Sequence, residues 1–489
     1  MCISRAKGGP VKPATGAELE EASYAAARDP DAGGPAGRGR GPLLGWLGRT
    51  LALLFPADPP AGGPRARRDA VRVAIASIAA VGVGAGALLV RQAGDPSWNT
   101  LFGEDGSHFL PRALSDPLGS LAQPLNGYMQ FVPQLIADAV TRLPLRYAAP
   151  GLAVAGALVA SACAWLVFRA SSGHIRSRPL RYLLAVAVVL LPIAPIELAA
   201  NAVDTPWYLM FASFWALVWR PSSRTGMAAA ALVCFGAMSS QFVAILLAPL
   251  VLARLIALPR LREQAPALGW LAGLAMQVPA LLRQQPAQLR GSPAPALGFY
   301  ADHVLTGVVA GWHLARGLAV EVGGLGTAVI AVSVVAAVAL WALVRGDGRV
   351  RMFIAVAMLL GLAETVIPAM SRLWVTNLPS MASWLPGSRY TAAPILLTVS
   401  AGIVAVDACL RRTAMPREKA AHAMAVALLV TVLGAGWVAD FRYHTIRSDS
   451  QPWSAAVSAF DQSCRNQPPS AHRPVPALRT SLPCSLAGH

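Results

Sequence analysis

Long apolar runs recur along the chain, and they constrain its fold more than any other feature of the sequence. Of the 489 residues, 55% are hydrophobic and only 13% are charged, whereas soluble domains typically carry about 25% charged residues. A run of about 20 apolar residues is long enough for a helix to cross a hydrocarbon core of about 30 Å. Backbone polar groups in lipid must be satisfied within the segment that crosses it. The sequence therefore predicts an all-α polytopic membrane protein.

The number and length of the apolar runs predict a bundle of about 11 transmembrane helices. Each range is read from the apolar stretch itself, so its ends are accurate to a few residues. We expect the spans near residues 71–91, 147–168, 181–200, 206–219, 225–240, 241–258, 267–282, 325–344, 352–371, 390–409 and 421–440.

Arginines gather in alternate short loops, for example at 65–72, 169–181 and 345–351. By the positive-inside rule these loops are cytoplasmic, which places the N-terminus inside and the C-terminus outside. The long loop 92–146 and the segment 441–489 are then extracytoplasmic. The net charge of +17 is therefore mostly a topology signal, and it argues against nucleic acid as a partner.

The segment 304–325 is apolar enough to be read as one more span. Counting it as a span would invert the rest of the topology and export the arginines at 345–351. We therefore expect a re-entrant or interfacial helix here. Its polar and aromatic residues are Trp312, His313, Arg316 and Glu321.

The two ends of the chain differ from the apolar middle, 65–440. Residues 1–64 are rich in Gly, Ala, Pro and Arg without apolar periodicity, which predicts a disordered cytoplasmic tail. Residues 441–489 predict a small strand-and-turn cap on the extracytoplasmic side. Cys464 and Cys484 are the two cysteines in this exported segment, so we expect them to form a disulfide.

A polar island, Phe102-Gly-Glu-Asp-Gly-Ser-His-Phe109, places Glu104 and Asp105 in the first long loop after a span. Adjacent carboxylates at a membrane surface can supply a general base or hold a divalent metal such as Mg or Mn. The flanking glycines let the backbone turn so that both side chains face a ligand. The alternative is a solvated turn. His108, in the same island, is a candidate substrate-binding residue.

Further polar residues stand at the expected outer ends of other spans. Asn201 and Asp204 lie between the third and fourth spans, and an acid there costs free energy unless it is solvated, paired or facing a cavity. Arg389 and Tyr390 open the tenth span, just after a loop that contains Arg372. An arginine at this depth can bind phosphate through two parallel hydrogen bonds or serve as a headgroup anchor. We expect these five residues, with His108, to bind substrate.

The chain resembles the GT-C class of integral-membrane glycosyltransferases, especially actinobacterial-type members. The Glu104–Asp105 pair in the first outer loop, the many spans and the exported C-terminal segment carry the resemblance. It implies a GT-C fold whose first loop carries helices. It also implies hexosyl or pentosyl transfer from a polyprenyl-phosphate donor to an envelope glycan or lipid, outside the bacterial plasma membrane.

Carried over by position, Glu104 and Asp105 match the acidic motif of that class, with Asp105 the first choice as general base on the acceptor hydroxyl. Some members of the class hold a divalent metal at these acids and others do not, so the resemblance leaves metal dependence open. The chain departs from larger members in its short exported segment 441–489, which argues against protein or peptide acceptors.

Two other classes of function fit the same spans. A transporter or flippase for a lipid-linked or small anionic substrate would use broken helices and intramembrane charge, for which Pro192, Pro368 and Glu364 are candidates. In a membrane assembly protein without catalysis, the acidic pair would simply be part of an ordinary turn.

Overall fold

The computed structural model describes residues 42–57, 66–192, 197–283, 291–371, 388–411, 416–442, 444, 446–478 and 480–488. These residues are mostly helical. The chain divides into two compact units, residues 1–50 and 51–489. The site and its supporting elements all belong to the second unit.

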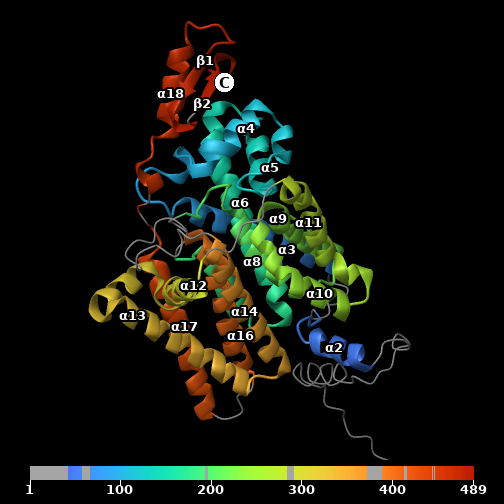
Figure 1. Cartoon of the computed structure of the whole chain (residues 1–489). Coiled ribbons are helices and arrows are strands. Elements are labelled where there is room, and N and C mark those ends of the chain that lie inside the picture. Colours follow the sequence, from blue (N-terminus) through green and yellow to red (C-terminus); the bar gives the residue numbers. More distant parts are fainter. Residues whose placement is uncertain are drawn as a thin grey trace, which may run out of the picture. The chain divides into compact units, whose positions relative to one another are not determined.

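The helices of the described residues vary widely in length (Figure 1). In chain order they are α2 (Pro42–Ala52), α3 (Ala66–Leu89), α4 (Leu110–Ser115), α5 (Phe131–Val140), α6 (Ala148–Ala170), α7 (Arg178–Val189), α8 (Thr205–Val218), α9 (Arg224–Ser240), α10 (Ala248–Ala257), α11 (Ala265–Arg283), α12 (Pro293–Phe299), α13 (Thr306–Arg345), α14 (Gly348–Ser371), α16 (Ala392–Leu410), α17 (Pro416–Ala439) and α18 (Trp453–Cys464). The strands β1 (His472–Val475) and β2 (Thr480–Pro483) pair antiparallel.

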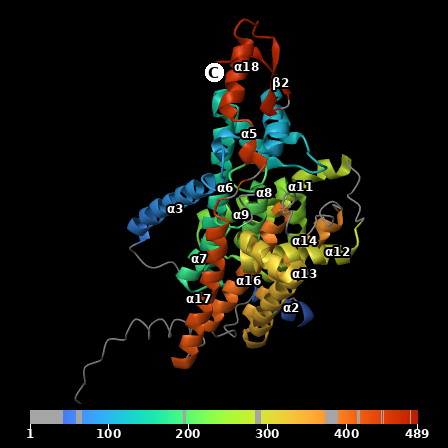
Figure 2. The ribbon, with the colours of Figure 1, turned by 90° about the vertical axis from the view of Figure 1, so that its left-hand side faces the viewer.

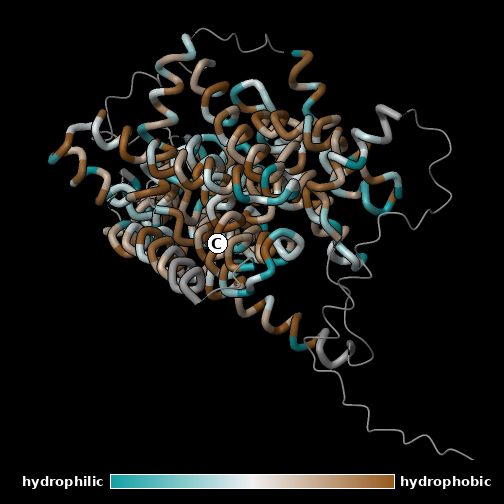
Figure 3. The backbone as a smooth tube through the Cα atoms, turned by 90° about the horizontal axis from the view of Figure 1, so that it is seen from below, coloured by the Kyte–Doolittle hydropathy of each residue, from teal (hydrophilic) through white to brown (hydrophobic). Residues whose placement is uncertain are grey.

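Six helical stretches among the described residues are long and apolar enough to cross a membrane. They are Val71–Leu89, Leu145–Gly173, Leu261–Arg283, Pro293–Arg345, Gly348–Ser371 and Ser388–Leu410. Hydrophobic residues run along most of the helices in Figure 3. The architecture is that of a helical membrane protein, while the expected 11 spans and their orientation stay predictions.

Two expected spans contain shorter α-helices than the sequence indicated. Helix α7 has 12 residues where 181–200 were expected to span, and α10 has 10 where 241–258 were expected. At 1.5 Å a residue, 12 residues cover only about 18 Å, less than the hydrocarbon core. The apolar run of α7 continues into Leu190 and Leu191, which are not helical, and that of α10 begins in the 3₁₀ helix η7 (Phe242–Leu247). Helix α8, with 14 residues, has the length that the sequence indicated.

The tail expected to be disordered over 1–64 includes ordered residues at its C-terminal end. Residues 42–52 form α2, and Leu54 and Phe55 are buried in the main core. The carbonyl of Leu54 lies 3.2 Å from Nε2 of His174. The expectation was wrong for this part of the tail, because its Leu and Phe side chains find an apolar partner that a single-sequence pattern does not reveal.

Helix α13 is not straight, because two glycines within it have backbone angles that other residues rarely adopt. Gly311 has φ 62° and ψ −164°, and Gly323 has φ 76° and ψ 160°. The residues between them, 312–322, form a helix only about 17 Å long. The expected re-entrant or interfacial segment over 304–325 stays a prediction, because the whole stretch Pro293–Arg345 is apolar enough to include a membrane span. The Asp440 carboxylate accepts hydrogen bonds from the amides of Trp312 and His313, at the start of this short helix.

The first long loop and the C-terminal segment fold together at one end of the bundle, which we call the cap end (Figures 1 and 2). Helices α4 and α5, the start of α6, and the cap formed by α18, β1 and β2 share one apolar core. Trp453 of α18 is buried in it and donates from Nε1 to the Leu145 carbonyl over 3.1 Å. The loop between α3 and α6 is therefore a helical layer, and the C-terminal cap packs directly on it.

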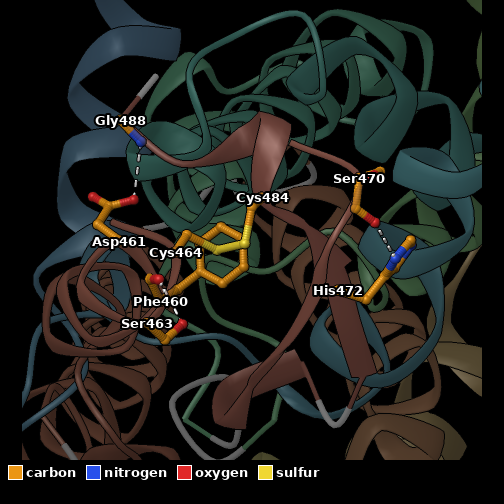
Figure 4. The surroundings of a disulfide bond; sticks show 8 residues. All are labelled: Phe460, Asp461, Ser463, Cys464, Ser470, His472, Cys484 and Gly488. Atoms are coloured by element: carbon orange, nitrogen blue, oxygen red, sulfur yellow. Dashed lines mark hydrogen bonds between the residues drawn. A yellow bond between two sulfur atoms is a disulfide. The ribbon is translucent and has the colours of Figure 1, made fainter. Parts of the chain in front are cut away.

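A disulfide closes the C-terminal cap (Figure 4). It joins Cys464 at the end of α18 to Cys484 just after β2, the pair that the sequence singled out, with Cα atoms 5.4 Å apart. Asp461 accepts a hydrogen bond from the Gly488 amide over 3.0 Å, which fastens the end of the chain to the same helix. The cap thus contains a helix in addition to the strands and turns that we expected.

Candidate functional site

Three segments that are distant in sequence meet at the cap end of the bundle. Both terminal nitrogens of Arg389 lie 3.3 Å from Oε1 of Glu104. Nη1 of Arg389 also lies 3.5 Å from Oδ1 of Asp204. The side chains of Arg389 and Glu104 are 20% and 26% exposed, so a ligand can reach this pair, whereas that of Asp204 is only 1% exposed. We call these three residues the Arg389 cluster.

The backbone around Arg389 is held by another acid, Glu197. Oε2 of Glu197 accepts a hydrogen bond from Ser388 Oγ over 3.0 Å and one from the Arg389 amide over 2.9 Å. These contacts secure the short 3₁₀ turn η11 (Ser388–Thr391) that leads into α16. The guanidinium of Arg389 is thereby carried on an ordered turn. Glu197 was not among the expected substrate-binding residues, although the sequence placed it beside Asn201 and Asp204.

Aromatic rings flank the Arg389 cluster. Tyr390 packs edge-to-face on Trp207 of α8 with ring centroids 5.0 Å apart, and the Arg389 guanidinium lies 5.9 Å from the centre of the Tyr390 ring. Such contacts favour the cationic guanidinium and restrict its motion. Tyr390 is therefore placed beside the expected phosphate-binding arginine, and Trp207 supports it.

Asp204 is a buried acid whose carboxylate has no hydrogen-bond donor among the described residues. Neither of its oxygens has such a partner, and the residue is fully buried. Burial raises the pKa of Asp204 well above its usual value, against the opposing effect of the Arg389 charge. A buried carboxylate without donors is costly unless it is paired or binds a ligand. Its position beside Arg389 makes it part of the site.

Asp105 has a different environment from its neighbour Glu104. It is 1% exposed, and its two oxygens accept hydrogen bonds from the amides of Ala202 and Val203 over 3.0 and 2.9 Å. Burial raises the pKa of Asp105 to about 7, although these amide hydrogen bonds lower it. The Asp105 carboxylate therefore joins the first loop to the turn that precedes α8.

Asn201 has a local structural role in the same turn. Its Oδ1 accepts a hydrogen bond from the Asp204 amide over 2.9 Å, and its Nδ2 donates to the Glu197 carbonyl. His108 is half-buried on the π-helical turn η3 (Asp105–Phe109). Arg372 lies outside the described residues. The structure thus brings Glu104, Asp204 and Arg389 together, with Asp105 and Asn201 directly behind Asp204.

The acids of the site do not form a metal centre as they are arranged here. Among the described residues, no group of three or more His, Cys, Asp and Glu side chains is placed to hold a metal ion. Glu104 faces Arg389, and both oxygens of Asp105 face backbone amides. The pair therefore points in two directions, and a shared divalent ion does not fit this arrangement.

Comparison with known proteins adds no family to this picture. A scan against protein-family models, a search of curated proteins and a search of solved structures each returned no match.

Proposed function

We propose that this chain is a membrane glycosyltransferase that transfers a sugar from a polyprenyl-phosphate donor to a hydroxyl group of an extracytoplasmic glycan or lipid. The observation that carries the proposal is the Arg389 cluster, in which a partly exposed arginine faces two acids beside aromatic rings. A guanidinium suits an anionic lipid phosphate, because it forms parallel hydrogen bonds and keeps its charge. A nearby carboxylate suits an acceptor alcohol, which is a weak nucleophile at neutral pH.

The proposed reaction exchanges one bond at the anomeric carbon of the donor for another. The bond from this carbon to the phosphate oxygen breaks, and its electron pair leaves with polyprenyl phosphate. The acceptor oxygen forms the new bond to the anomeric carbon, and its proton passes to a carboxylate of the protein. Arg389 stabilises the negative charge that develops on the leaving phosphate.

Glu104 is the carboxylate that we assign as general base. The sequence favoured Asp105, and a pKa of about 7 would suit that role. Geometry favours Glu104, because a base must reach the proton that it removes. Both Asp105 oxygens already accept backbone amides in a buried position, while Glu104 lies at the exposed side of the cluster. Asp105 is then a residue that orders the site.

The contact between Glu104 and Arg389 also suggests an order of events. Arg389 is paired with Glu104 over 3.3 Å. A donor phosphate that binds the same guanidinium competes with this carboxylate. Glu104 is then released to accept the proton of an acceptor hydroxyl, so we expect donor binding to precede acceptor activation.

A transporter remains the second candidate because of one observation. Glu364 of α14 is 1% exposed, and its Oε2 has no hydrogen-bond partner among the described residues. A buried acid in a candidate span is typical of ion and substrate pathways. In a transporter the Arg389 cluster would bind an anionic substrate without breaking a bond.

The experiment that tests the proposal follows a radiolabelled sugar on purified protein in nanodiscs. Polyprenyl-phosphate pentose and hexose donors are offered with an octyl glycoside acceptor, and labelled product and free polyprenyl phosphate are measured. We expect both to form with the wild type and with Glu321→Gln, a control at an exposed position, and neither to form with Glu104→Gln. Movement of intact donor across a liposome membrane without bond cleavage would favour the transporter instead.

A further inference from the structure

Arg447, between α17 and the C-terminal cap, is buried against backbone carbonyls from two distant segments. Its Nη1 donates to the carbonyls of Ala199 and Ala200 over 3.4 and 3.0 Å. Its Nη2 donates to the carbonyls of Ser97 and Thr100 over 2.6 and 2.9 Å, and its Nε donates to Thr100 Oγ1 over 3.0 Å. One guanidinium therefore joins the first loop to the turn before α8, and every contact that it makes there is to an oxygen acceptor.

The turn that Arg447 holds has a strained backbone. Ala200 has φ 52°, in the left-handed region that residues with a side chain seldom occupy. Such a conformation persists only when the surrounding structure imposes it. Arg447 donates a hydrogen bond to the carbonyl of Ala200 itself. Asp105 accepts hydrogen bonds from the amides of Ala202 and Val203, a short way further along the chain. Asp204 follows immediately.

A third contact restrains the same turn from the side of α6. A Cβ atom added to Gly156 would lie 2.0 Å from the Asn201 carbonyl oxygen, so the glycine is needed for the backbones to approach this closely. Arg447, Asp105 and Gly156 thus fix the turn from three sides. They belong to the segment before the C-terminal cap, the first loop and α6, none of which is continuous with α8 in the chain.

Resting on the proposed glycosyltransferase function, we infer that Arg447 is a positioning residue that sets the location of Asp204 beside Arg389. Among the described residues no hydrogen bond or ion pair joins Arg447 to the Arg389 cluster, although its charge interacts with Asp204. Its hydrogen bonds therefore act on Asp204 through the turn at 199–203. The C-terminal segment is then part of the catalytic architecture, because it supplies the side chain that keeps the strained turn in place. Burial lowers the pKa of Arg447 only to about 10, so the guanidinium stays charged at neutral pH.

The test compares Arg447→Met with Arg465→Met, which removes an exposed arginine at the end of α18. Asp204 lies 3.5 Å from the Arg389 guanidinium that stabilises the leaving phosphate, and misplacing such a group by about 1 Å can cost about a hundredfold in rate. We expect Arg447→Met to lower kcat by about that factor and to change the donor KM by less than about threefold. Hydrogen–deuterium exchange at the amides of Ala202 and Val203 should become faster in Arg447→Met and stay unchanged in Arg465→Met. Equal kcat and equal exchange in the two variants would overturn the inference.

Two further variants keep the test valid if Arg447→Met folds poorly. Gly156→Ala leaves Arg447 intact and displaces the turn from the opposite side, so it should also lower kcat more than it changes the donor KM. Ala200→Gly removes the backbone strain at this position. Combined with Arg447→Lys, it should restore part of the kcat that Arg447→Lys alone loses. Wild-type kcat in Gly156→Ala would overturn the inference.

Failure of the inference is distinguishable from failure of the proposed function. If the wild type transfers no sugar from any donor offered, the proposed function fails whatever the variants do. If the wild type transfers sugar and Arg447→Met behaves like Arg465→Met, only the positioning role of Arg447 fails.

Discussion

Among the described residues, Asp105 and the acids of the Arg389 cluster differ in how their oxygens are satisfied, and this difference supports the roles that we propose for them. Asp105, Asp407 and Asp440 are each 1% exposed, and each uses its two oxygens to accept hydrogen bonds from two consecutive backbone amides. The donors are Ala202 and Val203 for Asp105, Arg176 and Ser177 for Asp407, and Trp312 and His313 for Asp440. In each case a side chain fastens one segment to another that is distant in sequence.

The acids of the Arg389 cluster are not satisfied by backbone amides in this way. Glu104 and Asp204 accept no backbone amide among the described residues, and they contact Arg389 at 3.3 and 3.5 Å, longer than a typical charge-assisted hydrogen bond. Arg389 and Glu104 are also partly exposed. Asp105 therefore resembles the structural Asp407 and Asp440 more than its neighbour Glu104, and the Arg389 cluster has unused capacity for a ligand.

The largest expected effect is on kcat, and it distinguishes Glu104 from its neighbour Asp105. Glu104→Gln keeps the size of the side chain but removes the base, so kcat should fall by about 10²- to 10⁴-fold. Thermal stability should hardly change, because Glu104 is paired only at a partly exposed site. Steady-state sugar transfer and a melting curve on the same sample measure both. Wild-type turnover in Glu104→Gln would return the role of base to Asp105 or Asp204.

The next effect concerns the donor phosphate. Arg389→Lys keeps the charge but loses the planar pair of donors, and a lost hydrogen bond to a charged group costs about 1.5 to 3 kcal/mol. We therefore expect donor affinity to fall roughly tenfold to a hundredfold. Equilibrium binding of a polyprenyl-phosphate donor in nanodiscs measures it. Glu104→Gln should bind the same donor at least as tightly as the wild type, because it removes a competitor for Arg389, and weaker binding would contradict the proposed competition.

A third prediction tests whether Asp105 behaves as a structural acid. Asp105→Asn leaves one backbone amide facing an amide nitrogen, so the protein should lose about 1 to 3 kcal/mol of stability. Asp407→Asn loses the same kind of backbone contact and also weakens the ion pair with Arg411, so it should lose at least as much stability, and it serves as the comparison. Denaturation in detergent compares the two. A stable Asp105→Asn protein that has lost all turnover would favour a catalytic role for Asp105.

The last prediction concerns the dependence of stability on pH. Burial raises the pKa of Asp105 to about 7, so the folded state holds a proton that the unfolded state releases at about pH 4. Stability is therefore lost as the pH rises from about 4 to about 7, and it is not regained above that range. Asp204 contributes with the same sign. Melting temperatures across this range should fall less steeply in Asp105→Asn than in the wild type.

The sequence was informative about which polar residues stand at span ends, and less so about what each one does. Glu104 and Arg389 are 285 residues apart, yet both could be expected at one face because alternate span ends share a side of the membrane. The different roles of Glu104 and Asp105 follow from the direction of adjacent side chains, which no pattern records. Arg447 was missed because an arginine in a polar segment is ordinary until the fold buries it. The lengths of α7 and α10 likewise depend on where the α-helix gives way to a turn or a 3₁₀ helix.

The most direct test of the account is a structure with a non-hydrolysable polyprenyl-phosphate sugar bound. We predict that the donor phosphate lies within hydrogen-bond distance of both terminal nitrogens of Arg389. We also predict that Glu104 has moved off the guanidinium towards the acceptor side, while Asp105 keeps its two amides from Ala202 and Val203. A phosphate bound elsewhere, with the Glu104–Arg389 pair intact, would contradict the account.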